Sequence, residues 1–219
     1  MSARLDLPAA LAALAEQRPV FHSEADFQFA LAWVIREHHP RIEVRLERPV
    51  TLDGRRGHVD IWVRDADGEK AIELKYWVRE GELTVAGESF QHRGWAGDIE
   101  RCGLWKDVAR IERLIGSGLA GRGFVIGLAN LVGCWVEPRR EWERTNDAAF
   151  RLHEGRRVGG TLDWAEKTAA STRSLCSAPV TLRGSYLTRW REFSMPEPGL
   201  AGGEFRYLLL DVGAALGAS

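Results

Sequence analysis

The spacing of hydrophobic residues in the first forty positions predicts two amphipathic helices. Apolar side chains recur three and four residues apart over Leu7–Ala15 and again over Phe27–Ile35, which is the period of a helix with one buried face. Ser23 precedes the second segment and is a suitable N-cap, because its hydroxyl can accept a backbone N–H of the first turn. Pro40 ends the pattern, so the second helix is expected to stop before it.

A period of two residues follows and predicts strands. The turn sequences Asp53-Gly54 and Asp65-Ala66-Asp67-Gly68 separate them, as expected for consecutive hairpins. A smaller hairpin is expected over Glu82–Gln91, around Ala86-Gly87. The strands predicted by the alternation are, in chain order, Glu43–Val50, Gly57–Arg64 and Lys70–Val78.

The second half of the chain returns to the helical period before it becomes mixed. A long helix is expected over Trp95–Ile115, and the continuous apolar run Gly123–Leu128 is typical of a buried strand. Later segments suggest a helix over Thr161–Thr172 and strands over Val180–Phe193 and Glu204–Val212. These elements predict an α/β fold with a mixed central β-sheet flanked by helices and a C-terminal β-rich extension.

The length and composition fit one soluble globular domain. The chain has 219 residues, 45% of them hydrophobic and 28% charged, which is enough for one large core without disulfides or metals. We expect a single domain over residues 1–219, with its core at about 20–135 and the extension at about 136–219. No apolar run is long enough to span a membrane, and the first residues lack a signal-peptide pattern, so a cytoplasmic protein is expected.

Net charge and cysteine content make some classes of protein less favoured. The formal net charge is −1, whereas a protein dedicated to nonspecific nucleic-acid binding is usually strongly basic. An acidic metal site would nevertheless offset a basic surface elsewhere. Cys102, Cys134 and Cys176 match neither a zinc motif nor a disulfide framework, and we expect them to be buried, reduced thiols.

The candidate chemistry lies in the hairpin formed by the second and third predicted strands. If Arg64 pairs with Glu69 across the turn, Asp60 lies opposite Glu73, with Cβ atoms about 5 Å apart. Lys75 then shares the face of Glu73, because side chains alternate along a strand. The alternative is the solvated face of an amphipathic strand, but apolar residues surround all three charges.

Two adjacent carboxylates near a core are unfavourable because they repel each other and lose hydration. A hard divalent cation, Mg²⁺ or Mn²⁺, would relieve that conflict, and Lys75 would hold or deprotonate an attacking water. Glu24 lies at the start of the second helix, on the side of its apolar face. Two roles stay open for it: approach to the metal or its waters, and complementing the helix dipole.

The order of these elements resembles the core of the PD-(D/E)xK nucleases over Ser23–Leu128. The resemblance implies that Asp60 and Glu73 bind Mg²⁺ together with the Leu74 carbonyl, and Lys75 matches the catalytic lysine of that family. Glu24 matches the acid that many members carry in the first helix. Val59 stands where the motif name has proline. Two later segments also resemble an uncharacterised bacterial group of this superfamily: Gly123–Trp135 and Phe150–Phe193.

The resemblance implies a metal-dependent nuclease that hydrolyses phosphodiester bonds in DNA, with RNA as a less favoured substrate. A homodimer is expected on the ground that cutting both strands of a duplex often needs two sites. The near-neutral charge supports an alternative, a catalytically silent protein of this fold that binds nucleic acid or a partner. A weaker alternative is a phosphoesterase acting on nucleotides. Along the long helix, Lys106, Asp107 and Arg110 are expected to form ion pairs on the helix surface.

Overall fold

A computed structural model describes residues 4–94, 97–138 and 141–213. Its centre is a six-stranded sheet with the strand order β1-β2-β3-β6-β10-β9. The inner strands β3 and β6 run parallel, and the other neighbouring strands are antiparallel. The strands are β1 (Glu43–Leu52), β2 (Arg55–Asp65), β3 (Gly68–Trp77), β6 (Arg122–Ala129), β10 (Phe205–Asp211) and β9 (Trp190–Ser194).

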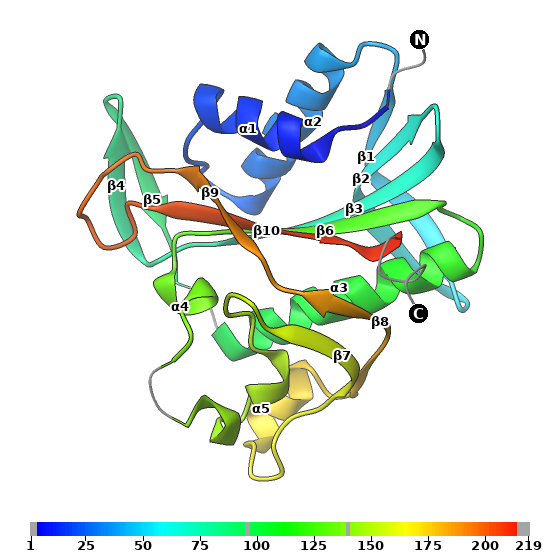
Figure 1. Cartoon of the computed structure of the whole chain (residues 1–219), viewed down its shortest axis with the longest axis vertical. Helices are drawn as coiled ribbons and strands as arrows, with labels where there is room; N and C mark the ends of the chain where they lie inside the picture. The colour runs from blue at the N-terminus through cyan, green and yellow to red at the C-terminus, as the bar shows by residue number, and fades with distance from the viewer. Residues whose placement is uncertain (1–3, 95–96, 139–140, 214–219) are drawn as a thin grey trace.

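Helices cover both faces of the sheet, as Figure 1 shows. The pair α1 (Leu7–Gln17) and α2 (Glu24–His38) lies on one face, and α3 (Gly97–Gly116) lies on the other. The predicted N-cap of α2 is confirmed, because the Ser23 hydroxyl accepts a hydrogen bond from the Asp26 N–H at 3.1 Å. The expected first residue of the long helix, Trp95, lies outside the described residues.

Each face of the sheet has its own hydrophobic core. The apolar stripe of α2, including Phe27, Leu31 and Ile35, packs in one cluster with Ile61 and Ile72 of the sheet. Burial of this stripe explains why the segment keeps the helical period predicted from its sequence. No helix among the described residues is long and apolar enough to cross a membrane.

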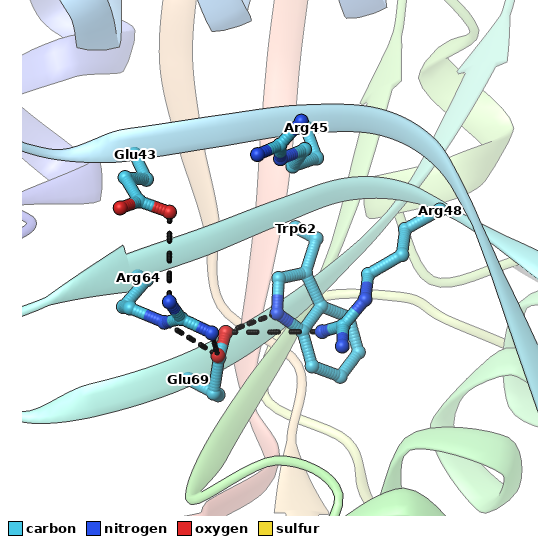
Figure 2. Close-up of a pocket in the computed structure, with 6 residues that line it drawn as sticks. All are labelled: Glu43, Arg45, Arg48, Trp62, Arg64 and Glu69. Carbon is cyan, nitrogen blue, oxygen red and sulfur yellow. Dashed lines mark hydrogen bonds and ion pairs between the residues drawn. The ribbon is translucent and has the colours of Figure 1, made fainter.

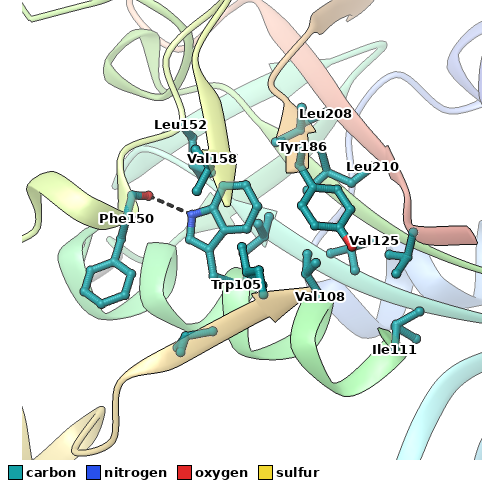
Figure 3. Close-up of a cluster of buried hydrophobic side chains, with 14 of the residues drawn as sticks. Trp105, Val108, Ile111, Val125, Phe150, Leu152, Val158, Tyr186, Leu208 and Leu210 are labelled. Carbon is teal, nitrogen blue, oxygen red and sulfur yellow. Dashed lines mark hydrogen bonds between the residues drawn. The ribbon is translucent and has the colours of Figure 1, made fainter. Parts of the chain in front are cut away.

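The second core lies between the sheet, α3 and the C-terminal region (Figure 3). Trp105 and Val108 of α3 are fully buried there, together with Val125 of β6. The Trp105 indole N–H donates to the Phe150 carbonyl at 3.1 Å, so the largest side chain of this core has its polar atom paired. The C-terminal region therefore contributes to the central core instead of forming a separate one.

The C-terminal region differs from the expected extension. Strands β9 and β10 complete the central sheet, and the two-stranded sheet of β7 (Arg157–Leu162) and β8 (Val180–Leu187) packs beyond α3. The helix expected over Thr161–Thr172 is wrong, because Thr161 pairs with Thr181 in β7–β8 and the local helix is α5 (Ala170–Leu175). The strand expected over Val180–Phe193 is divided between β8 and β9.

The remaining elements are short, and the cysteines need a correction. The small hairpin predicted around Ala86-Gly87 is confirmed. Cys102 and Cys176 form a disulfide with a Cα–Cα distance of 6.7 Å, so the expectation of reduced thiols is wrong for this pair. Cys134 is free and buried, as expected. The short elements are β4 (Gly81–Val85), β5 (Glu88–His92), α4 (Val132–Trp135), η1 (Trp142–Arg144) and η2 (Ala148–Phe150).

Candidate active site

The strands β2 and β3 separate at the residues predicted to carry the chemistry. Their register is the predicted one, since Arg64 pairs with Glu69 and the ladder continues to the pair of Ile61 and Ile72. The ladder ends there, so the expected strand pair of Asp60 and Glu73 does not form. Beyond this point the backbone of β3 that faces β2 needs other hydrogen-bond partners.

Two of the predicted carboxylates accept hydrogen bonds from that part of β3. Asp60 Oδ2 accepts the Leu74 N–H at 2.7 Å, and Glu24 Oε2 accepts the Tyr76 N–H at 3.0 Å. The Leu74 carbonyl lies on the same edge, because the N–H and C=O of one strand residue point the same way. Glu24, Asp60 and the Leu74 backbone therefore meet in the opening between β2 and β3.

A glutamine of α2 fixes the outer side of this opening. Gln28 Nε2 donates to the Asp60 carbonyl at 2.6 Å and to Glu47 Oε1 at 2.7 Å. Glu47 of β1 has a φ of 50°, which is uncommon for a residue other than glycine, and the β1–β2 ladder skips it. The carboxylate of Glu47 thus joins the cluster, although the sequence pattern gave no reason to select it.

Glu73 and Lys75 point from the α3 side of β3 toward that helix. Lys75 Nζ lies 2.9 Å from Asp107 Oδ2 and 3.1 Å from the Leu74 carbonyl. The Arg110 guanidinium forms an ion pair with Glu73 Oε1 and donates to the His58 carbonyl at 2.6 Å. All four predicted side chains, Glu24, Asp60, Glu73 and Lys75, therefore border the opening between β2 and β3.

Asp107 and Arg110 correct an expectation from the sequence. The expected ion pair along the helix is present, with Arg110 Nη2 3.6 Å from Asp107 Oδ1. The two side chains are not on the surface, however, because they are only 26% and 16% exposed and also pair with residues of β3. Their signal in the sequence is the spacing from Val108 and Ile111, which are fully buried and mark the side of α3 that faces the sheet. Asp107 lies next to this stripe and adds a carboxylate to the cluster.

Burial makes the ionised state of the three carboxylates unfavourable. Loss of solvent raises the pKa of Glu24, of Asp60 and, most strongly, of Glu73, whose side chain is 1% exposed. The negative charge of Asp107 adds to the increase for Glu73, whereas the Arg110 guanidinium opposes it. The cations of the cluster, Lys75 and Arg110, thus do not fully offset the cost of ionising its carboxylates.

Lys75 has the opposite balance of effects. Burial alone would lower its pKa, but the negative charges of Asp107, Glu24 and Asp60 outweigh burial and raise the pKa above its ordinary value. The Lys75 side chain is therefore a fixed cation within the cluster.

The donor atoms of the cluster are those that hard divalent cations prefer. Asp60 uses only Oδ2 for the Leu74 N–H, and the Leu74 carbonyl lies beside it. Among the described residues, however, no group of three or more His, Cys, Asp or Glu side chains is arranged around a common metal position. Glu73 pairs with Arg110 instead, so a metal ion would compete with this guanidinium.

A second charged cluster on the same sheet face stabilises the strands (Figure 2). The Arg48 guanidinium lies 3.9 Å from the centroid of the Trp62 ring, whose indole N–H donates to Glu69. Arg64 Nε donates to Glu69 at 2.6 Å, and Arg64 Nη1 lies 3.7 Å from Glu43 Oε2. Both Glu69 oxygens are thus engaged by neighbours, which is typical of a cluster that holds strand register.

Comparisons with protein-family models, with curated proteins and with solved structures give no match to this chain.

Proposed function

We propose that this protein is a metal-dependent nuclease that hydrolyses phosphodiester bonds in DNA on a restriction-endonuclease-like, PD-(D/E)xK core. The observation that supports it most is the meeting of Asp60, Glu73 and Lys75 where β2 leaves β3. Buried carboxylates beside a fixed cation are unfavourable for folding alone. A bound metal ion would offset the charge of the carboxylates, and a phosphate would offset the charge of Lys75.

Each residue of the cluster has a role in this proposal. Asp60, Glu73 and the Leu74 carbonyl would hold Mg²⁺ or Mn²⁺, which when bound acts as a Lewis acid toward the scissile phosphate. Lys75 would position or activate the attacking water and balance the charge of the phosphate. Glu24 keeps one oxygen on the Tyr76 N–H and would orient the water with the other.

One observation favours the alternative of a catalytically silent protein on the same fold. Arg110 pairs with Glu73 and so supplies the positive charge that a metal would otherwise bring. In that case the carboxylates would only satisfy the backbone of β3 and the neighbouring cations. An active enzyme and a silent one differ in whether DNA is cut and whether cutting depends on Glu73 and Lys75.

Cleavage of supercoiled plasmid DNA in Mg²⁺ or Mn²⁺ tests the proposal. We expect cutting by the unaltered protein, and a loss of roughly a hundredfold or more in Glu73→Ala and Lys75→Ala, because each removes metal binding or transition-state charge. Lys167→Ala is the matched control, since Lys167 is exposed and far along the chain from the cluster. Single-stranded DNA and RNA of one sequence, run in parallel, separate the substrate classes.

The possible outcomes distinguish the candidate functions. Cutting that needs the metal, persists in Lys167→Ala and is lost in both site variants supports the nuclease. Cutting that persists in Glu73→Ala and Lys75→Ala would show that these residues are not the active site. No cutting of any substrate by the unaltered protein favours the silent alternative. The homodimer expected for double-strand cutting stays a prediction.

A further inference from the structure

A groove that adjoins the carboxylate cluster is lined by more cationic than acidic side chains. It has a volume of about 870 Å³ and lies between α3, the start of β2 and the segment that leads into β8. It begins at Asp107 and Arg110, the two α3 residues that contact Glu73 and Lys75, so it opens from the candidate active site. The cations that line it are Arg55, Lys106, Arg110, Arg113 and Arg183.

Three of these cations are on one side of α3. Lys106, Arg110 and Arg113 are spaced four and three residues apart, which places them in a row along the helix. The row spans about 10 Å at a rise of about 1.5 Å per residue. That length covers roughly three phosphates of one DNA strand, whose charges follow at about 3.4 Å along the duplex axis.

Carboxylates pair with two of the three cations in this row, since Arg110 contacts Glu73 and Asp107, and Arg113 lies 3.1 Å from Asp53. The buried carboxylate of Glu112 is engaged by the backbone N–H groups of Arg183 and Gly184 and by the Tyr186 hydroxyl. Asp107 is engaged by Lys75 and by Arg110 of the row. The exposed side chains of Arg55, Lys106 and Arg183 have no carboxylate partner in the part of the chain that the structure describes.

The chemistry of the lining favours one kind of polyanion. None of the described lining residues is aromatic, whereas sites for single strands commonly stack bases on aromatic rings. Arginine and lysine side chains contact phosphates without reading the sequence. A duplex presents regularly spaced phosphates with its bases turned inward, and it is therefore the form of nucleic acid that this surface fits best.

The far wall of the groove is held to α3. The disulfide joins Cys102 of α3 to Cys176, and the next residues, Ser177 to Thr181, form that wall. Glu112 of α3 holds the beginning of β8 through the Arg183 and Gly184 N–H groups. Two independent links thus fix the width of the groove, as expected of a surface that receives a ligand of defined shape.

We propose that this groove binds the phosphate backbone of duplex DNA, without sequence preference, and leads it to the carboxylate cluster. The inference rests on the proposed nuclease function only for what happens to the DNA once it is bound. It predicts a local binding surface in a chain whose net charge is −1.

Fluorescence anisotropy with a labelled duplex in EDTA tests binding apart from cleavage. The test variant is Arg55→Gln/Lys106→Gln/Arg183→Gln, which removes three exposed cations outside the carboxylate cluster. We expect this variant to bind the duplex at least roughly tenfold more weakly than the unaltered protein does at low salt. The slope of log affinity against log salt concentration should become less negative by roughly 2 to 3, because each lost phosphate contact removes about 0.9 from the slope. The single strand of the same sequence should bind no tighter than the duplex.

The matched control carries the same change of charge elsewhere. Arg41→Gln/Lys167→Gln/Arg191→Gln also removes two arginines and one lysine that are exposed, and its duplex affinity should stay close to that of the unaltered protein. Equal affinity of test and control variants, or much tighter binding of the single strand, would overturn the proposal. Groove-dependent duplex binding without metal-dependent cutting would contradict the nuclease function but support the groove.

Discussion

At the scale of single residues, the site is a set of carboxylates whose structural tasks use only part of their binding capacity. Asp60 and Glu24 each accept one N–H of β3, and Glu73 pairs with Arg110. Each of these acids has a second oxygen, and burial raises the pKa of all three. A protein that needed only acceptors for two amides would not require a third buried acid.

Glu73→Gln should stabilise the metal-free protein increasingly as the pH rises. The pKa of Glu73 is raised in the folded state, so the folded protein binds more protons than the unfolded chain above the unfolded pKa. Stability is therefore lost as the pH rises toward the folded pKa, and the glutamine, which does not ionise, escapes this loss. Urea unfolding in EDTA between about pH 5 and about pH 8 measures the difference.

The comparison of variant with unaltered protein isolates Glu73 from other titrating groups. Burial lowers the pKa of His92 and His153. These two histidines therefore make the protein more stable as the pH rises toward their unfolded pKa, which is opposite in sign to the effect of Glu73. Their contribution is common to both proteins and cancels in the difference. A stability difference that stays constant with pH would show that Glu73 titrates normally.

At the scale of elements, α3 connects the sheet, the candidate site and the C-terminal region. One side of it buries Trp105 and Val108 in the core, and another directs Asp107 and Arg110 toward β3. Glu112 reaches the opposite way and accepts hydrogen bonds from β8. A single helix thereby sets the distance between the carboxylate cluster and the wall of the groove.

Glu112→Ala should lower the free energy of unfolding by about 3 kcal/mol, because it leaves buried donors of β8 without an acceptor. Glu112→Gln keeps a carbonyl oxygen for the Arg183 and Gly184 N–H groups and should be milder. Chemical denaturation of both variants measures the effect. A loss below about 1 kcal/mol in the alanine variant would mean that this link does not hold β8 to α3.

At the scale of the whole molecule, local patterns predicted more than long-range ones. The alternation and the Asp65–Gly68 turn were sufficient for the register of β2 and β3, because a tight turn and a half-buried face fix it locally. The separation of the strands at Asp60 was not predictable, since it depends on α2 and Glu47. The side of α3 that carries Asp107 likewise depends on which core the helix contacts.

The placement of the C-terminal strands shows the same limit more clearly. β10 pairs antiparallel with β6, its neighbour in the sheet but distant in sequence. The apolar pattern of Glu204–Val212 indicated a strand but contained no information on its partner. The expected boundary near residue 136 therefore separated strands that belong to one sheet. The groove between α3 and β8 was likewise not predictable from the sequence, because it too depends on contacts between distant segments.

Binding of Mn²⁺, followed by electron paramagnetic resonance in the absence of DNA, tests the metal site directly because it needs no knowledge of the substrate. We predict saturable binding by the unaltered protein, its loss in Asp60→Asn and in Glu73→Gln, and normal binding in Glu69→Gln, an acid of the neighbouring cluster in Figure 2. Absence of saturable binding by the unaltered protein, or equal binding by Asp60→Asn and Glu73→Gln, would contradict a metal centre at the opening between β2 and β3.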